Sequence, residues 1–145
     1  MFGEEIIVTN RLLKLDPKKR ITIPAETKVE FGEKIYPMFS PLCEYLILYN
    51  EQDFLKAIDA YKNLFDRYRQ EGKVDAKKYR NLLRYLYATL CFAEEQVDKQ
   101  HRIVLPKSVV EQMKLNSTIF AVGRQNHLEL YKDEASYQSI LSKRK

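Results

Sequence analysis

The chain has 145 residues, of which 45% are hydrophobic and 31% charged, and its formal net charge is +5. This composition excludes wholesale disorder, and the length suits one ordinary domain or two small ones with a shared core. No apolar run approaches the roughly 20 residues needed to cross a bilayer. The start, Met1-Phe2-Gly3-Glu4-Glu5, lacks the basic and then apolar plan of a secretory signal. We therefore expect a soluble, cytoplasmic protein that contacts no membrane.

Cysteine and histidine usage predicts no metal site. Cys43 and Cys91 have no CxxC spacing, and His101 and His127 form no recognisable ligand set with them. We interpret His127, on an expected strand, as a packing residue. The sequence also has no Gly-rich phosphate loop, nucleophile elbow or His-Glu metal pattern. We expect no cofactor, no small-molecule substrate and no enzymatic activity.

A ten-residue segment at positions 15–24 is repeated at positions 97–106. In both copies an Asp is followed four positions later by an Arg, then by a short, mainly apolar stretch and a Pro. The interval of 82 residues between Arg20 and Arg102 is too long for a solenoid repeat and suits a duplicated small domain. The same interval, with no gap, aligns further residues: Leu46 with Leu128, Leu48 with Leu130, and Tyr49 with Tyr131.

In chain order, the first copy reads as a hairpin followed by a short helix and two more strands. Residues 6–8 and 12–15 suit strands, 16–19 a turn, and 21–23 a second strand. The tip of this hairpin carries the Lys and Arg side chains. Pro24 suits the start of a helix over about 25–31, and strands are expected at 35–39 and 45–49.

The segment between the copies is expected to form an antiparallel helical hairpin. Apolar residues at helical spacing make one stripe from Phe54 to Tyr68 and another from Tyr79 to Leu90. Asn50 is the expected N-cap of the first helix, and Asp75 is the candidate N-cap of the second.

The second copy repeats the plan of the first. Strands are expected near 92–97 and at 102–105, 118–122 and 128–131, with a helix over about 107–114. A last helix should begin at Asp133.

Positive charge is concentrated around the first motif, as binding to a polyanion requires. A single acid, Asp16, stands there among five basic residues: Arg11, Lys14, Lys18, Lys19 and Arg20. A solvated turn that happens to be basic would be the alternative if the motif occurred once. The helical segment instead mixes both signs, which is typical of a solvated surface.

With these two motif copies flanking a helical insert, the chain resembles the MraZ family of bacterial transcriptional regulators, each half being similar to a SpoVT/AbrB-type domain. The resemblance implies an α+β fold in which two SpoVT/AbrB-like halves form one pseudo-symmetric swapped-hairpin β-barrel. It divides the chain into a first half at 6–50, a helical insert at 51–91, a second half at 92–132, and a C-terminal helix and tail at 133–145.

The resemblance also implies partners and a location. Members of this family assemble into ring-like homo-oligomers and bind double-stranded DNA at repeats upstream of the division and cell-wall gene cluster. For this chain it therefore implies a nucleoid-associated, sequence-specific regulator.

Arg20 and Arg102, at the family's motif positions, present forked donors for guanine edges or phosphate. Asp16 and Asp98 are expected to hold the turns and orient these arginines, since a carboxylate facing phosphate is repelled. A purely structural Asp–Arg bridge is the alternative. The other candidate DNA-binding residues are expected to contact mainly phosphate or, for Gln100 and His101, base edges: Arg11, Lys14, Lys18, Lys19, Lys99, Gln100 and His101.

One departure concerns the residue before the motif Arg, which is usually Gly in the family. Here that residue is Lys19 in the first copy and His101 in the second. Gly adopts a left-handed backbone freely, whereas Lys or His adopts it at some cost. The shape of the tip and the preferred DNA sequence are therefore open on sequence grounds.

Two other functions compete with DNA binding. AbrB-type antitoxins share the barrel, but they usually carry a long toxin-wrapping tail, and the tail here is only 142–145. The second alternative is a ring-forming interaction module that has lost DNA binding.

Overall fold

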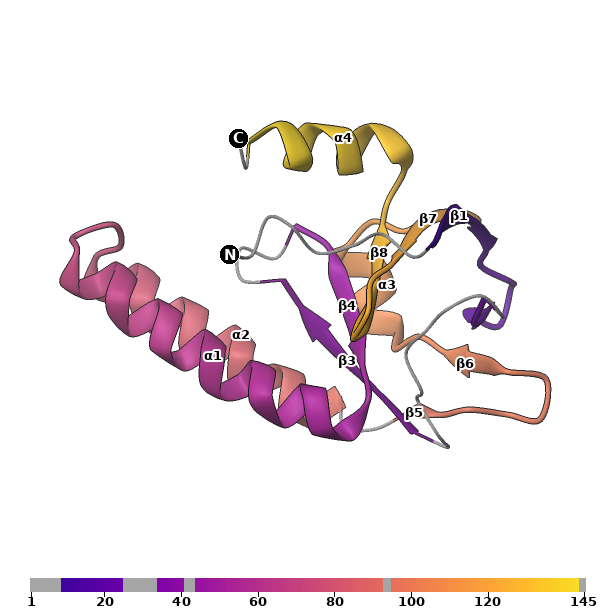
Figure 1. The fold of residues 1–145 in the computed structure, drawn as a ribbon, viewed down its shortest axis with the longest axis horizontal. Coiled ribbons are helices and arrows are strands. Elements are labelled where there is room, and N and C mark those ends of the chain that lie inside the picture. The colour runs from indigo at the N-terminus through magenta and orange to yellow at the C-terminus, as the bar shows by residue number, and fades with distance from the viewer. Residues whose placement is uncertain (1–8, 25–33, 41–43, 93–94, 144–145) are drawn as a thin grey trace.

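The computed structural model describes residues 9–24, 34–40, 44–92 and 95–143, and shows an α+β fold with an antiparallel sheet (Figure 1). Its elements are β1 (Thr9–Lys14), β2 (Arg20–Thr22), β3 (Lys34–Phe39), β4 (Leu46–Tyr49), α1 (Glu51–Gln70), α2 (Ala76–Phe92), β5 (Glu95–Gln96), β6 (Arg102–Val104), α3 (Lys107–Gln112), β7 (Thr118–Gly123), β8 (His127–Tyr131) and α4 (Glu134–Lys143). Six strands form one sheet, and β2 and β6 form a second, two-stranded sheet.

The order of the six-stranded sheet is symmetric about its centre. The strands lie in the order β1-β7-β8-β4-β3-β5, so each strand and its equivalent from the other copy are equally far from the centre. In the central β4–β8 ladder, Ile47 pairs with Glu129, 82 positions further along the chain. The two copies are therefore related by a pseudo-two-fold axis that passes through this pair.

The first strand of each copy pairs with the other copy. β1 pairs with β7, and β5 pairs with β3. The expected ladder between the two strands that flank the first turn is wrong, because β2 pairs with β6 instead. Two backbone bonds close the turn, from Asp16 N to Arg20 O at 3.0 Å and from Lys19 N to Asp16 O at 2.9 Å. Pairing β2 with β6 buries Ile21 and Ile103 together in the core, which a local hairpin would not do.

The repeat interval is not constant, contrary to the gap-free alignment expected. Lys14 pairs with Thr118, and the matching pair in the other half of the sheet is Gln96 with Lys34. Lys14 and Gln96 are 82 positions apart, whereas Lys34 and Thr118 are 84 apart. The turn between β7 and β8 is correspondingly shorter than the β3–β4 connection, so the 82-residue interval returns at β8.

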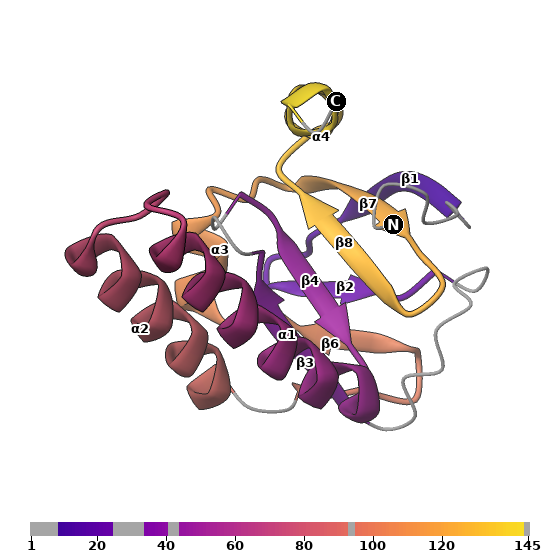
Figure 2. The same cartoon turned by 60° about the vertical axis from the view of Figure 1, so that its left-hand side comes forward.

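The helical hairpin is confirmed. α1 and α2 lie side by side and extend away from the loop before β6 (Figures 1 and 2). Asn50 caps α1 by accepting a hydrogen bond from Asp53 N at 2.9 Å, and Asp75 accepts one from Lys78 N at 2.7 Å. Buried Phe54 stacks on Tyr36 of β3 with 4.9 Å between ring centroids, which anchors the hairpin on the sheet.

Several element boundaries differ from expectation. The strand expected from Phe92 is wrong at its start, because α2 continues to Phe92 and β5 covers only Glu95–Gln96. The apolar residues of the insert keep their helical spacing into this segment, so the helix continues there. α4 begins one residue after Asp133, whose side chain accepts a hydrogen bond from Ser136 N at 2.7 Å.

Two expected elements, the strand at 6–8 and the helix at 25–31, lie outside the described residues. Among the helices that the structure describes, none is long and apolar enough to span a membrane.

Candidate nucleic-acid interface

The first motif folds into a turn that its Asp holds together. Asp16 Oδ1 accepts hydrogen bonds from the backbone N–H groups of Lys18 at 2.9 Å and Arg20 at 2.8 Å. Its other oxygen, Oδ2, accepts one from Arg20 Nε at 2.7 Å. A carboxylate that bonds the backbone just ahead of it is the usual basis of such Asp turns. The turn therefore fixes both the backbone and the direction of the Arg side chain.

The second motif repeats this geometry atom for atom. Asp98 Oδ1 accepts from Gln100 N and Arg102 N, both at 2.8 Å, and Oδ2 accepts from Arg102 Nε at 2.8 Å. Two tips with different intervening residues thus share one backbone conformation.

Both Asp side chains stay ionised well into the acid range. The backbone N–H of Arg20, followed by that residue's side chain, lowers the pKa of Asp16 below its ordinary value of 3.8. The backbone N–H of Arg102 lowers the pKa of Asp98 in the same way. Each Arg keeps its Nη groups available, because no other described residue pairs with either side chain.

The residue before each motif Arg has a left-handed backbone conformation, which Gly adopts freely. Lys19 has φ +63° and His101 has φ +59°. The carbonyl of each accepts a bond from the opposite copy: Leu105 N donates to Lys19 O at 2.7 Å, and Ile23 N donates to His101 O at 2.8 Å. These reciprocal bonds tie the two tips together, which explains why the strained backbone persists without Gly.

The β2–β6 ribbon places the two arginines on one outer face. Ile21 and Ile103, its directly opposed central residues, are both 1% exposed and point inward. Arg20 is opposite Val104, and Arg102 is opposite Thr22, so these four side chains share the other face. Arg20 and Arg102 are diagonal neighbours on this antiparallel ribbon, and the Cα atoms of such neighbours are about 7–8 Å apart.

The structure separates the remaining candidates into two groups. Lys18, Lys19, Lys99, Gln100 and His101 are exposed on the two tips. Arg11 and Lys14 are exposed on β1, an outer strand of the six-stranded sheet, and so belong to a different element. The tips and the ribbon face form the compact candidate site, which we call the ribbon interface: residues 16–20, 22, 98–102 and 104.

Sequence reasoning missed two members of this interface. Thr22 and Val104 are exposed, and Val104 is 47% exposed although apolar. Their alternation with Ile21 and Ile103 was the available signal, because a residue on either side of a buried strand position faces outward.

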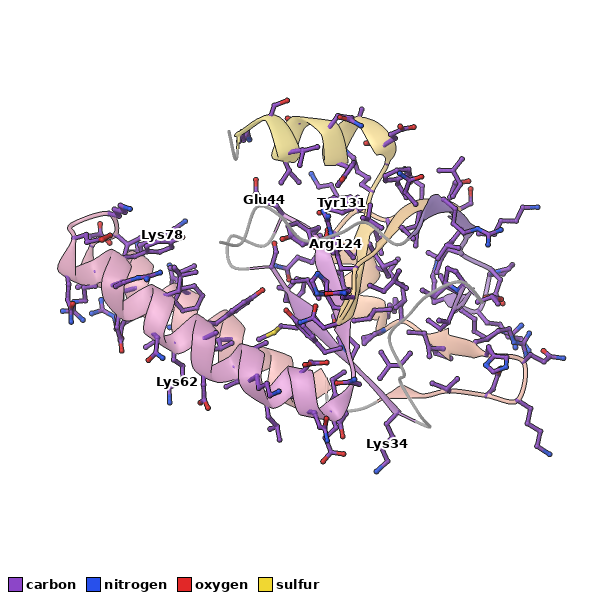
Figure 3. All side chains as sticks on the ribbon, viewed as in Figure 1. Lys34, Glu44, Lys62, Lys78, Arg124 and Tyr131 are labelled. Atoms are coloured by element: carbon purple, nitrogen blue, oxygen red, sulfur yellow. The ribbon has the colours of Figure 1, made fainter. Side chains whose placement is uncertain are left out.

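Reasoning from sequence also missed a buried polar cluster on β8 and the preceding turn. Glu129 accepts hydrogen bonds from Tyr131 OH at 2.7 Å and pairs with His127 Nε2 at 2.8 Å. Arg124 Nε is 3.6 Å from the same carboxylate; Figure 3 shows Arg124 and Tyr131 near the middle of the molecule. Burial alone would raise the pKa of Glu129, but bonding to His127 and the other partners lowers it. His127 is thus not the plain packing residue expected.

Comparisons with known proteins point to the MraZ family. A family model described as "MraZ protein, putative antitoxin-like" matches residues 93–145. "Transcriptional regulator MraZ" of Mycoplasmopsis pulmonis is 29% identical over 127 residues, covering 87% of this chain and 78% of the relative. The protein of that name from Caldicellulosiruptor saccharolyticus is 28% identical over 120 residues, covering 83% and 76%. That of Ureaplasma parvum is 24% identical over 121 residues, covering 83% and 77%. All three names describe regulators rather than enzymes.

Proposed function

Because the chain belongs to the MraZ family, we propose that it is a transcriptional regulator that binds double-stranded DNA through the ribbon interface. The observation that carries this proposal is the identical anchoring of Arg20 and Arg102 on one exposed face. A site built twice with the same hydrogen bonds, and presented outward both times, suits a ligand that is itself repetitive.

The ribbon has the dimensions of a major-groove reader. The major groove is about 12 Å wide and admits a two-stranded β-ribbon. Because Nε of each Arg is held by an Asp, the two Nη groups remain for guanine O6 and N7 or for phosphate. Asp16 and Asp98 act as positioning residues behind the arginines and do not face the DNA.

The exchange of β1 and β5 between the copies supports a swapped-hairpin barrel made by two SpoVT/AbrB-like halves. In this interpretation residues 6–50 and 92–132 are the halves, 51–91 the insert and 133–145 the C-terminal helix and tail. α1 and α2 lie away from the ribbon and leave it open to DNA (Figure 1).

The proposal extends to assembly and targets as the family resemblance implies. One ribbon covers a short stretch of DNA, so a ring-like homo-oligomer that engages successive repeats would supply the affinity. The repeats would lie upstream of the division and cell-wall gene cluster, and the protein would be cytoplasmic and nucleoid-associated.

The test is removal of both arginines. The double variant Arg20→Ala/Arg102→Ala should lose retention of promoter DNA in an electrophoretic shift assay while keeping its thermal unfolding midpoint within a few degrees. The matched control is Arg67→Ala/Arg80→Ala, which removes the same charge from exposed positions on the helical hairpin. Equal DNA affinity for the two double variants would disprove the proposed interface.

A second candidate is an antitoxin, because the matching family model carries that term in its description. This function requires a stoichiometric protein partner. Affinity purification of the tagged chain from its host, with nuclease treatment, would recover such a partner if the antitoxin function holds. Recovery of the chain alone, together with bound promoter fragments from an untreated sample, favours the regulator.

A further inference from the structure

The two tips are equal in backbone but unequal in chemistry. Lys18 and Gln100 occupy the same place, since each donates its backbone N–H to the motif Asp, at 2.9 and 2.8 Å. Lys19 and His101 likewise share the left-handed position. Any functional difference between the tips therefore comes from side-chain type and not from the shape of the turn.

Apart from Asp16, whose oxygens are used within the turn, the side chains of the first tip can donate hydrogen bonds but cannot accept them. Lys18 and Lys19 end in ammonium groups, which carry three donors and no acceptor, and Arg20 is also donor-only. An ammonium suits phosphate or guanine, but it cannot accept a bond from the amino group of adenine or cytosine. The three cations are consecutive, so this tip has a dense positive charge.

The second tip combines donors with acceptors. The Gln100 amide has both, and a Gln pairs in two places with the adenine edge in the major groove. His101 adds a ring that donates or accepts, and Lys99 and Arg102 are the only fixed cations of this tip, residues 99–102. Its chemistry favours base edges over phosphate.

The outer face of the ribbon continues the same difference. Thr22 in the first copy corresponds to Val104 in the second, each opposite the other copy's Arg. Val104 is 47% exposed, and an exposed apolar side chain beside two arginines matches the thymine methyl group, the one apolar feature of the major groove.

We propose that the two copies have different roles at the ribbon interface, a difference that we call its polarity: the second copy reads the bases and the first copy holds the phosphate backbone. This inference rests on the proposed function. One pseudo-dimer then recognises a directional element with guanine, adenine and thymine edges under Arg102, Gln100 and Val104, and not a palindrome.

Exchanging the equivalent residues Lys18 and Gln100 between the two tips tests this polarity. Gln100→Lys gives the second tip the chemistry of the first, and Lys18→Gln does the reverse; both positions are exposed. The measurement is fluorescence-anisotropy binding of a fragment selected by the unaltered chain, compared with fragments bearing single base changes, at several salt concentrations.

We expect Gln100→Lys to remove discrimination at one base pair, a loss of roughly 5- to 150-fold in the affinity ratio. Lys18→Gln should keep that ratio and reduce the slope of log affinity against log salt by about 0.9. In the same assay, Val104→Ser should lose preference for thymine over uracil, whereas Thr22→Ser should not change it, because only the methyl group distinguishes these bases.

The outcomes separate the inference from its premise. If the two exchanges alter base discrimination equally, or if the selected sequence is palindromic, the polarity is disproved while DNA binding stands. If the unaltered chain selects no DNA, the proposed function itself fails.

Discussion

Lys19 and His101 hold a backbone conformation that most L-residues avoid. The cross-copy bonds to their carbonyls keep both at positive φ, where a side chain costs about 1 kcal/mol or more. We expect Lys19→Gly and His101→Gly each to raise the free energy of unfolding by about 0.5–1 kcal/mol, measured by urea denaturation.

The control for these variants is Lys18→Gly, since Lys18 is not at positive φ. Glycine there only adds freedom to the unfolded chain, so that variant should be less stable. A loss of stability in all three variants would contradict the strain argument.

The two motif carboxylates make stability depend on pH in the acid range. Folding lowers the pKa of Asp16 and Asp98 below 3.8, so their contribution is present above that pH and is lost as the pH falls through the folded values. We expect Asp16→Asn/Asp98→Asn to be less stable than the unaltered chain at pH 6 and to approach it below about pH 4. Glu129 also has a lowered pKa, but it is present in both chains and cancels in the difference. A difference in stability that is the same at pH 3 and pH 6, by urea denaturation, would disprove this role.

At the scale of elements, the β2–β6 ribbon gives the sharpest test of the pseudo-symmetry. Ile21 and Ile103 are equivalent, directly paired and equally buried. Ile21→Ala and Ile103→Ala should therefore destabilise by similar amounts, about 2–5 kcal/mol each. Val104→Ala on the outer face should change the free energy of unfolding by less than about 0.5 kcal/mol. Strongly unequal effects of the two Ile variants in denaturant unfolding would show that the halves are not equivalent.

Local chemistry made some elements predictable from sequence. The Asp-x-x-x-Arg turns, the caps at Asn50 and Asp75, and the helical hairpin each depend on residues within a few positions of one another. Strand partners were not predictable in this way, because β1 and β2 each pair with a strand roughly 80 or more residues away. The alternation that marks a strand does not say which strand lies beside it.

The candidate site was predicted in part for the same reason. The motif identified the tips, but only the β2–β6 register places Arg20, Val104, Thr22 and Arg102 on one face. In the buried cluster, the spacing of His127, Glu129 and Tyr131 by two residues on one strand was a visible signal. Their mutual bonds depend on burial, which the spacing alone does not reveal.

At the scale of the whole molecule, affinity should depend on how many ribbons engage one DNA. A single ribbon interface offers a handful of phosphate contacts, and each neutralised phosphate contributes about −0.9 to the slope of log affinity against log salt. If several subunits of an oligomer bind successive repeats, affinity should rise by about 10²- to 10⁴-fold from one repeat to two, with a steeper salt slope. Native mass spectrometry of the free protein and titration of fragments with one or two repeats would measure both.

The spacing between repeats supplies the control for that experiment. Inserting half a helical turn, about five base pairs, turns the second repeat to the opposite side of the duplex and prevents simultaneous engagement by a rigid assembly. Affinity should then return to the single-repeat value, and an insertion of a full turn of about ten base pairs should restore part of the gain. Equal affinity for all spacings, or a monomer in the mass measurement, would mean that each pseudo-dimer binds alone and that recognition rests on the two arginine tips of one chain.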